Sequence, residues 1–137
     1  MLLVDTGPLV ATADTDDPDH RRCRTLLEEH EGPLLTTPMV IAEAAYLIDR
    51  QLGPAAEAAL FASLAEGELL VEELSRDDWR RIGELVTTYS DARLGGTDAS
   101  LVAVAERLGI TRLATLDERH FRPLRPAHVA AFEILPG

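Results

Sequence analysis

Apolar and polar positions alternate along this chain in two patterns, short apolar runs and longer amphipathic stretches. The short runs predict five buried strands, at residues 2–4, 34–37, 69–71, 113–116 and 132–135. The longer stretches predict helices at residues 17–31, 38–52, 55–66 and 97–108, with one more after the turn at residues 5–8 and one containing Trp79, Ile82 and Leu85. Strands separated by helices indicate right-handed crossovers. We therefore expect an α/β fold, a three-layer α/β/α domain with a central, mainly parallel sheet of about five strands, over residues 1–137.

Local signals support some of these elements. Pro8 suits the first turn of a helix, where its missing N–H is not needed. Ser75, followed three residues later by Asp78, predicts a helix N-cap. In the helix that follows, Trp79 and Leu85 stand at helical spacing, and we expect both to face the core.

Composition places the chain among ordinary globular proteins. Its 137 residues suit one hydrophobic core, and 46% of them are hydrophobic and 27% charged. The single cysteine, Cys23, excludes an internal disulfide and a cysteine-based zinc cage. The first apolar run stops at Asp5, which is too early for a signal peptide or a membrane span. We therefore expect a cytoplasmic protein with no membrane association.

The basic residues narrow the possible chemistry. All 13 of them are arginine, so mechanisms that need lysine are excluded, including P-loop NTPases, Schiff-base enzymes and Ser-Lys hydrolases. The net charge of −11 argues against a polyanionic partner. Either the partner is basic, or the acids cluster where a metal ion inverts the local charge.

Two acids are expected at one edge of the sheet. Asp5 follows the first strand and Asp117 follows the strand at residues 113–116. Binding sites of parallel sheets form beyond the carboxyl ends of the strands, so both carboxylates are expected at the same edge. Helix N-capping is the plain structural alternative for each of them.

Asp98 lies in the first turn of its predicted helix, where the helix dipole alone already favours a negative charge. Its neighbours at helical spacing, Leu101, Val102 and Ala105, place it on the apolar face that points to the core. A carboxylate at the edge of the core needs a partner.

Glu43 lies in the middle of a helix, where capping cannot explain it. The segment Met39–Ile48 contains no other charge, and Val40 and Leu47 share its face. A glutamate there is costly unless an arginine or a metal ion pairs with it. Four acids that converge without lysine form the oxygen-rich environment that Mg²⁺ or Mn²⁺ prefers. Such ions lower the pKa of a bound water and neutralise charge on a phosphodiester.

Four segments together resemble the PIN-domain ribonucleases, specifically the VapC-type toxins of prokaryotic toxin–antitoxin pairs. These segments are Leu3–Leu9, Ile41–Ala44, Thr97–Glu106 and Ala114–Asp117, followed by Phe121. The resemblance implies a PIN fold and a Mg²⁺- or Mn²⁺-dependent endoribonuclease that cleaves an RNA such as tRNA or rRNA. Asp5, Glu43, Asp98 and Asp117 fall on the acidic quartet of the family, and Thr6 and Thr115 fall where hydroxyl groups support that site.

The resemblance also implies roles and partners. Asp5, Asp98 and Asp117 would hold one or two metal ions, and Glu43 would orient or deprotonate the attacking water, leaving a 3′-hydroxyl and a 5′-phosphate. The family's toxins form homodimers and are silenced by a cognate VapB-type antitoxin, whose basic tail the charge of −11 would suit.

Several residues near the expected site keep two interpretations. The arginines nearest in the sequence to the last acid would hold the RNA backbone or form a solvated face; they are Arg112, Arg119, Arg122 and Arg125. Asp91 and Arg93 would shape the rim of the site or cap a loop, and His120 lies close enough to Asp117 to border the site.

Rival classes of protein fit less well. A phosphatase of the haloacid dehalogenase type needs a second aspartate where this chain has Gly7, and it needs a lysine. A phospho-receiver domain also needs a lysine. The remaining alternative is a catalytically silent PIN-fold protein that binds or regulates only within a protein complex.

Overall fold

The computed structural model describes residues 1–137, which form five strands and seven helices. In chain order these are β1 (Leu2–Val4), α1 (Thr6–Ala13), α2 (His20–Glu29), β2 (Leu34–Thr36), α3 (Pro38–Leu52), α4 (Pro54–Ala65), β3 (Leu70–Val71), α5 (Arg76–Thr88), α6 (Gly96–Leu108), β4 (Arg112–Ala114), α7 (Glu118–Phe121) and β5 (Glu133–Leu135). No helix is both long and apolar enough to cross a membrane.

The strands form one sheet in the order β3-β2-β1-β4-β5, and every neighbouring pair is parallel. Leu3 of the central strand pairs with Leu35 on one side and with Leu113 on the other. The three residues of β1 are completely buried. The predicted sheet of about five strands is therefore confirmed, and it is wholly parallel. As a result, the carboxyl ends of β1, β2 and β4 meet at one edge.

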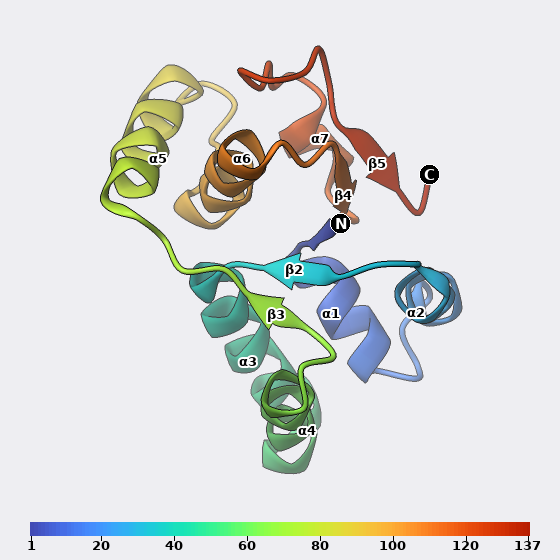
Figure 1. Ribbon diagram of the computed structural model, residues 1–137. Coiled ribbons are helices and arrows are strands. Elements are labelled where there is room, and N and C mark those ends of the chain that lie inside the picture. The colour runs from blue at the N-terminus through green and yellow to red at the C-terminus, as the bar shows by residue number, and fades with distance from the viewer.

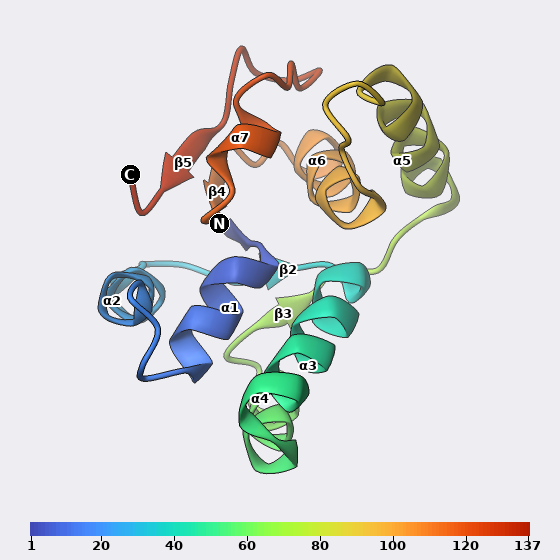
Figure 2. The same cartoon turned by 180° about the vertical axis from the view of Figure 1, so that it is seen from behind.

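Helices cover both faces of this sheet, which confirms the predicted three layers. Helices α1 to α4 gather on one side, and α5 packs with α6 on the other (Figures 1 and 2). Helix α6 is the most deeply enclosed, since every residue from Ala99 to Ala105 is buried. It therefore forms part of the core and carries Asp98 in its half-buried first turn.

The helix ends follow the local signals in the sequence. Asp5 caps α1 through a hydrogen bond from the Thr6 N–H, and Pro8 lies in the first turn. Ser75 and Asp78 form the reciprocal capping box at the start of α5. These caps fix where α1 and α5 begin, and so fix the direction in which the chain leaves the sheet.

Two expectations about individual segments are wrong, and one short helix was not predicted. Strand β4 ends at Ala114, two residues early, and the chain then turns into the short helix α7, which no apolar pattern predicted. Trp79 is 53% exposed, because Ile82 and Leu85 form the buried face of α5 and Trp79 lies beside that face. The turn after β4 carries Asp117 towards the carboxyl edge of the sheet.

Candidate active site

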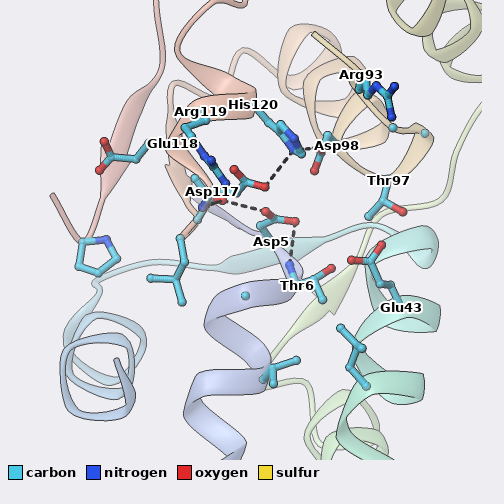
Figure 3. A pocket seen from close by; sticks show the side chains of 18 of the residues that line it. Asp5, Thr6, Glu43, Arg93, Thr97, Asp98, Asp117, Glu118, Arg119 and His120 are labelled. Atoms are coloured by element: carbon cyan, nitrogen blue, oxygen red, sulfur yellow. Dashed lines mark hydrogen bonds and ion pairs between the residues drawn. The ribbon is translucent and has the colours of Figure 1, made fainter. Parts of the chain in front are cut away.

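A polar cleft of about 860 Å³ lies at the carboxyl edge of the sheet, and only three of the 20 residues that line it are hydrophobic. The four acids singled out in the sequence all line this cleft, each from a different segment: Asp5, Glu43, Asp98 and Asp117 (Figure 3). Asp5 follows β1, Glu43 belongs to α3, Asp98 begins α6 and Asp117 precedes α7. The fold thus gathers carboxylates that are far apart in the sequence.

Asp5 is buried at the floor of the cleft, with 5% of its surface exposed. One carboxylate oxygen accepts a hydrogen bond from the Thr6 N–H and the other from the Thr115 hydroxyl, each at 2.8 Å. Burial raises the pKa of Asp5, the two hydrogen bonds oppose that rise, and the charges of Glu43 and Asp117 add to it. Asp5 therefore both caps α1 and belongs to the acidic cluster.

Thr115 joins two of the acids. Its hydroxyl donates to Asp5 and accepts a hydrogen bond from the Asp117 N–H at 3.0 Å. The side chain is buried, so this bond pattern is protected from water. Thr115 therefore fixes the Asp5 carboxylate and the turn that carries Asp117.

Asp98 and Asp117 are bridged by an imidazole. Nδ1 of His120 lies 3.0 Å from an oxygen of Asp98 and 2.9 Å from an oxygen of Asp117 (Figure 3). The Asp98 side chain is 16% exposed, and burial, followed by the charge of Asp5, raises its pKa to about 6 although His120 acts in the opposite sense. The sequence placed His120 only at the border of the site. Its spacing from Asp117, three residues on in a short helix, was the available signal.

Glu43 is exposed, so the expectation that it would lie on a buried apolar face is wrong. Helix α3 buries Val40, Ala44 and Ile48, and Glu43 lies at the margin of that face, above the cleft (Figure 3). No arginine pairs with it, and its carboxylate makes no hydrogen bond in the structure. Its charge acts on Asp5, whose pKa it raises.

The other residues proposed from the sequence divide between the cleft and the surface. Of the four arginines, only Arg119 lines the cleft. Arg112 pairs with Glu133, Arg122 pairs with Glu118, and Arg125 donates to backbone carbonyls of its own segment. Asp91 is exposed and lies outside the cleft. Those three arginines and Asp91 therefore lie outside the site.

Further lining residues were missed or left open by the sequence. Arg93, with two possible interpretations, lines the cleft, and so do Thr97, Glu118 and Arg22. Arg22 reaches it from α2, and its guanidinium is bound to Asp19. No sequence signal marked Arg22, because only the packing of α2 beside α1 brings it there.

The donor set fits a divalent cation that prefers oxygen. Burial raises the pKa of both Asp5 and Asp98, and neighbouring carboxylates raise each pKa further, so a counter-charge would stabilise the ionised forms. The hydroxyl of Thr6 is buried beside Asp5 without a hydrogen-bond partner. Carboxylate and hydroxyl oxygens are hard ligands of the kind Mg²⁺ takes. The acidic and histidine side chains do not form a ready-made metal-binding arrangement.

The fold is a parallel sheet with an acidic cleft at its carboxyl edge, and comparison with known proteins identifies its family. The PIN domain family matches residues 2–124, and the chain belongs to that family. Over 135 residues it is 33% identical to Ribonuclease VapC26 of Mycobacterium tuberculosis, with 98% of this chain and 100% of that protein covered. The resemblance to VapC-type PIN-domain ribonucleases is thereby confirmed.

Solved structures agree on the fold. The crystal structure of VapC20 of Mycobacterium tuberculosis, described as a sarcin-ricin loop cleaving toxin, superposes with a TM-score of 0.78 at 23% identity, covering 82% of this chain and 87% of that one. FitAcB of Neisseria gonorrhoeae superposes with a TM-score of 0.63 at 20% identity, covering 97% of each chain. Both likenesses concern the arrangement of strands and helices.

Proposed function

We propose that this chain is a Mg²⁺- or Mn²⁺-dependent endoribonuclease and the toxin of a VapBC-type toxin–antitoxin pair. The observation that carries the proposal is the convergence of Asp5, Glu43, Asp98 and Asp117 on one polar cleft. The family and the similarity to Ribonuclease VapC26 support RNA as the substrate. A tRNA or an rRNA loop is the expected target class.

The four acids and Thr115 have different roles in the proposed cleavage. Asp5, Asp98 and Asp117 would hold the cation, which when bound supplies charge neutralisation at the phosphodiester and a lower pKa for the attacking water. Thr115 keeps Asp5 and the Asp117 turn in place. Glu43, which has no partner and faces the cleft, is suited to orient the attacking water and accept its proton. Attack on phosphorus leaves a 3′-hydroxyl on one fragment and a 5′-phosphate on the other.

The test is cleavage of total cellular RNA by the purified chain with Mg²⁺ or Mn²⁺, and with EDTA. Asp5→Asn should abolish cleavage, since it removes a buried charge of the site. Asp91→Asn is the matched control, because Asp91 is an acid close to the site in sequence but outside the cleft.

Discrete fragments that disappear with EDTA and in Asp5→Asn, but persist in Asp91→Asn, would support the proposal. If the folded chain cuts no RNA with either metal, the proposed activity is wrong, and the chain is better described as a silent PIN-fold binding protein.

The proposed partner is a VapB-type antitoxin with a basic tail. The net charge of −11, together with a cleft containing six acidic residues, favours a cationic segment there. Calorimetry with a co-expressed partner should show affinity that falls as salt rises. The homodimer and the cytoplasmic location stay predictions, of which light scattering tests the first.

A further inference from the structure

Most arginines of this chain are already bound to other groups of the protein. Seven form ion pairs: Arg22, Arg24, Arg80, Arg81, Arg107, Arg112 and Arg122. Arg50 binds the Tyr46 hydroxyl and Arg125 binds backbone carbonyls. The guanidinium groups of the remaining four bind nothing in the structure: Arg21, Arg76, Arg93 and Arg119. Of these four, Arg93 and Arg119 line the acidic cleft.

The two cleft arginines approach from different segments. Arg93 belongs to the turn between α5 and α6, and Arg119 belongs to α7. Figure 3 shows Arg93 on the side of Asp98 and Arg119 on the side of Asp117, with the carboxylates between them. Both side chains are exposed, so their guanidinium groups are open to a ligand.

Arg93 also has an unusual backbone. Its φ of 55° makes it the one non-glycine residue with a positive φ in the chain. The left-handed region is unfavourable for a residue with a Cβ atom, and glycine or asparagine would satisfy the turn better. A strained residue at the rim of a cleft indicates a role for its side chain, because the fold alone does not require arginine there.

The negative charge of the cleft indicates which ligand group Arg93 and Arg119 would bind. Six acids line the cleft: Asp5, Asp17, Glu43, Asp98, Asp117 and Glu118. An RNA strand entering this cleft is repelled wherever a phosphate meets an acid that no cation covers. A metal ion at the carboxylates serves the cleaved phosphodiester, but it leaves the neighbouring phosphates without a counter-charge. The guanidinium fork matches phosphate oxygens in charge and geometry.

We propose that Arg93 and Arg119 form a phosphate-binding pair that holds the RNA backbone on the two sides of the carboxylate cluster. This inference rests on the proposed ribonuclease function and adds the residues that bind its substrate. It assigns the role to a different pair from the four arginines that the sequence suggested, with Arg119 common to both.

Binding is measured separately from cleavage. The probe is a fluorescein-labelled, single-stranded RNA 12-mer of mixed sequence, followed by anisotropy in Mg²⁺ with every variant built on Asp5→Asn, and a gel verifies that the RNA stays intact. Arg93→Gly, Arg119→Gln and their combination are compared with Arg76→Gln, which removes an equally unbound arginine outside the cleft. Titrations at several salt concentrations give the number of phosphates contacted.

Each cleft substitution is expected to weaken binding roughly tenfold, as for a lost charged hydrogen bond, and to reduce the salt slope by about 0.7. Arg76→Gln should change neither quantity. Arg93→Gly should keep or raise the Tm, since glycine relieves the positive φ. Weaker binding in that variant is then not a folding defect.

Three results would overturn the arginine pair. The first is a double variant that binds RNA with the affinity and salt slope of Arg76→Gln. The second is an Asp5→Asn protein that binds no RNA at low salt. The third is a labelled hexaglutamate peptide that binds more tightly than RNA with the same arginine dependence, which would assign the arginines to an acidic protein ligand.

Cleavage of cellular RNA by chains that retain Asp5 separates this inference from the proposed function. Cleavage combined with unchanged RNA binding in the double variant refutes only the arginine pair. No cleavage combined with arginine-dependent RNA binding refutes the nuclease and keeps the phosphate site.

Discussion

At the scale of single residues, the cleft brings together carboxylates that repel one another and an imidazole that bonds two of them. Asp98 is surrounded by other acids and partly buried, and the imidazole of His120 is hydrogen-bonded to it. The pKa of about 6 means that the folded protein keeps a proton on Asp98 that the unfolded chain has already lost at pH 5. Ionisation of Asp98 therefore lowers the stability of the metal-free protein.

This pKa gives a stability prediction with a definite sign. Because the folded-state pKa of Asp98 is raised, its contribution to stability is highest at acid pH and is lost as pH rises from about 4 to about 6. Asp98→Asn should thus stabilise the metal-free chain by on the order of 2 kcal/mol at pH 7.5 and by little at pH 4. Urea titrations of both proteins at the two pH values measure this difference. An equal effect at both values would contradict the raised pKa.

His120 offers a second prediction. Its imidazole bonds the same carboxylates that would hold a cation, so it competes for their oxygens. His120→Ala should bind Mn²⁺ roughly five- to tenfold more tightly than the unaltered chain. Calorimetry with Mn²⁺ alone measures the change, with His128→Ala as the control, since His128 lies outside the cleft. Weaker binding in His120→Ala would instead make His120 a ligand.

At the scale of elements, the position of Asp98 depends on how α6 is fastened to α5. Arg107 of α6 bonds both carboxylate oxygens of Asp78 at 3.1 Å, and Arg81 of α5 bonds Glu106 at 2.7 Å. Asp78 also closes the capping box of α5. Burial of Asp78 works to raise its pKa, but the hydrogen bonds from Arg107 and Ser75 outweigh burial and lower it.

Removal of Asp78 should therefore loosen both helices. Asp78→Ala loses a cap and leaves Arg107 without its buried partner, which should cost about 2–3 kcal/mol at pH 7. Because the pKa of Asp78 is lowered, this stability is present above about pH 4 and is lost as pH falls further. Asp77→Ala is the control, since Asp77 is 87% exposed and should change stability little. Denaturant titrations at pH 7 and pH 3 measure both effects. Equal losses of stability for the two variants would contradict the role of Asp78 in joining α5 to α6.

The elements also show what the sequence can and cannot predict. The strands were predictable because short apolar runs have no other place in a small domain, and Asp5 and Asp98 followed from their positions at strand and helix ends. The helix α7 was not, because its four residues Glu118–Phe121 contain too few apolar positions to form a pattern. The exposure of Glu43, the bridge by His120 and the entry of Arg93 depend on turns and on tertiary packing, for which a local pattern contains no information.

At the scale of the whole molecule, the acids raise the energy of the unliganded fold, and a cation should recover part of it. Ligand binding to the folded state alone stabilises a protein by RT ln(1 + [L]/Kd), roughly 2.7 kcal/mol at a hundredfold excess over Kd. Mg²⁺ or Mn²⁺ should thus raise the Tm of the unaltered chain and of Asp91→Asn, but not that of Asp5→Asn. Thermal melts at matched ionic strength measure this. A shift that survives in Asp5→Asn would place the cation elsewhere.

The sheet order has a consequence for the synthesis of the protein. Strand β1, made first, pairs with β4, which is made near the end, and the hydroxyl of Thr115 completes the contact with Asp5. A ribosome that is still making the first hundred residues therefore carries a chain without Asp117 and without the strand that aligns it. Fragments from broken messages lack the same parts. The acidic cleft is consequently incomplete until the chain is nearly finished.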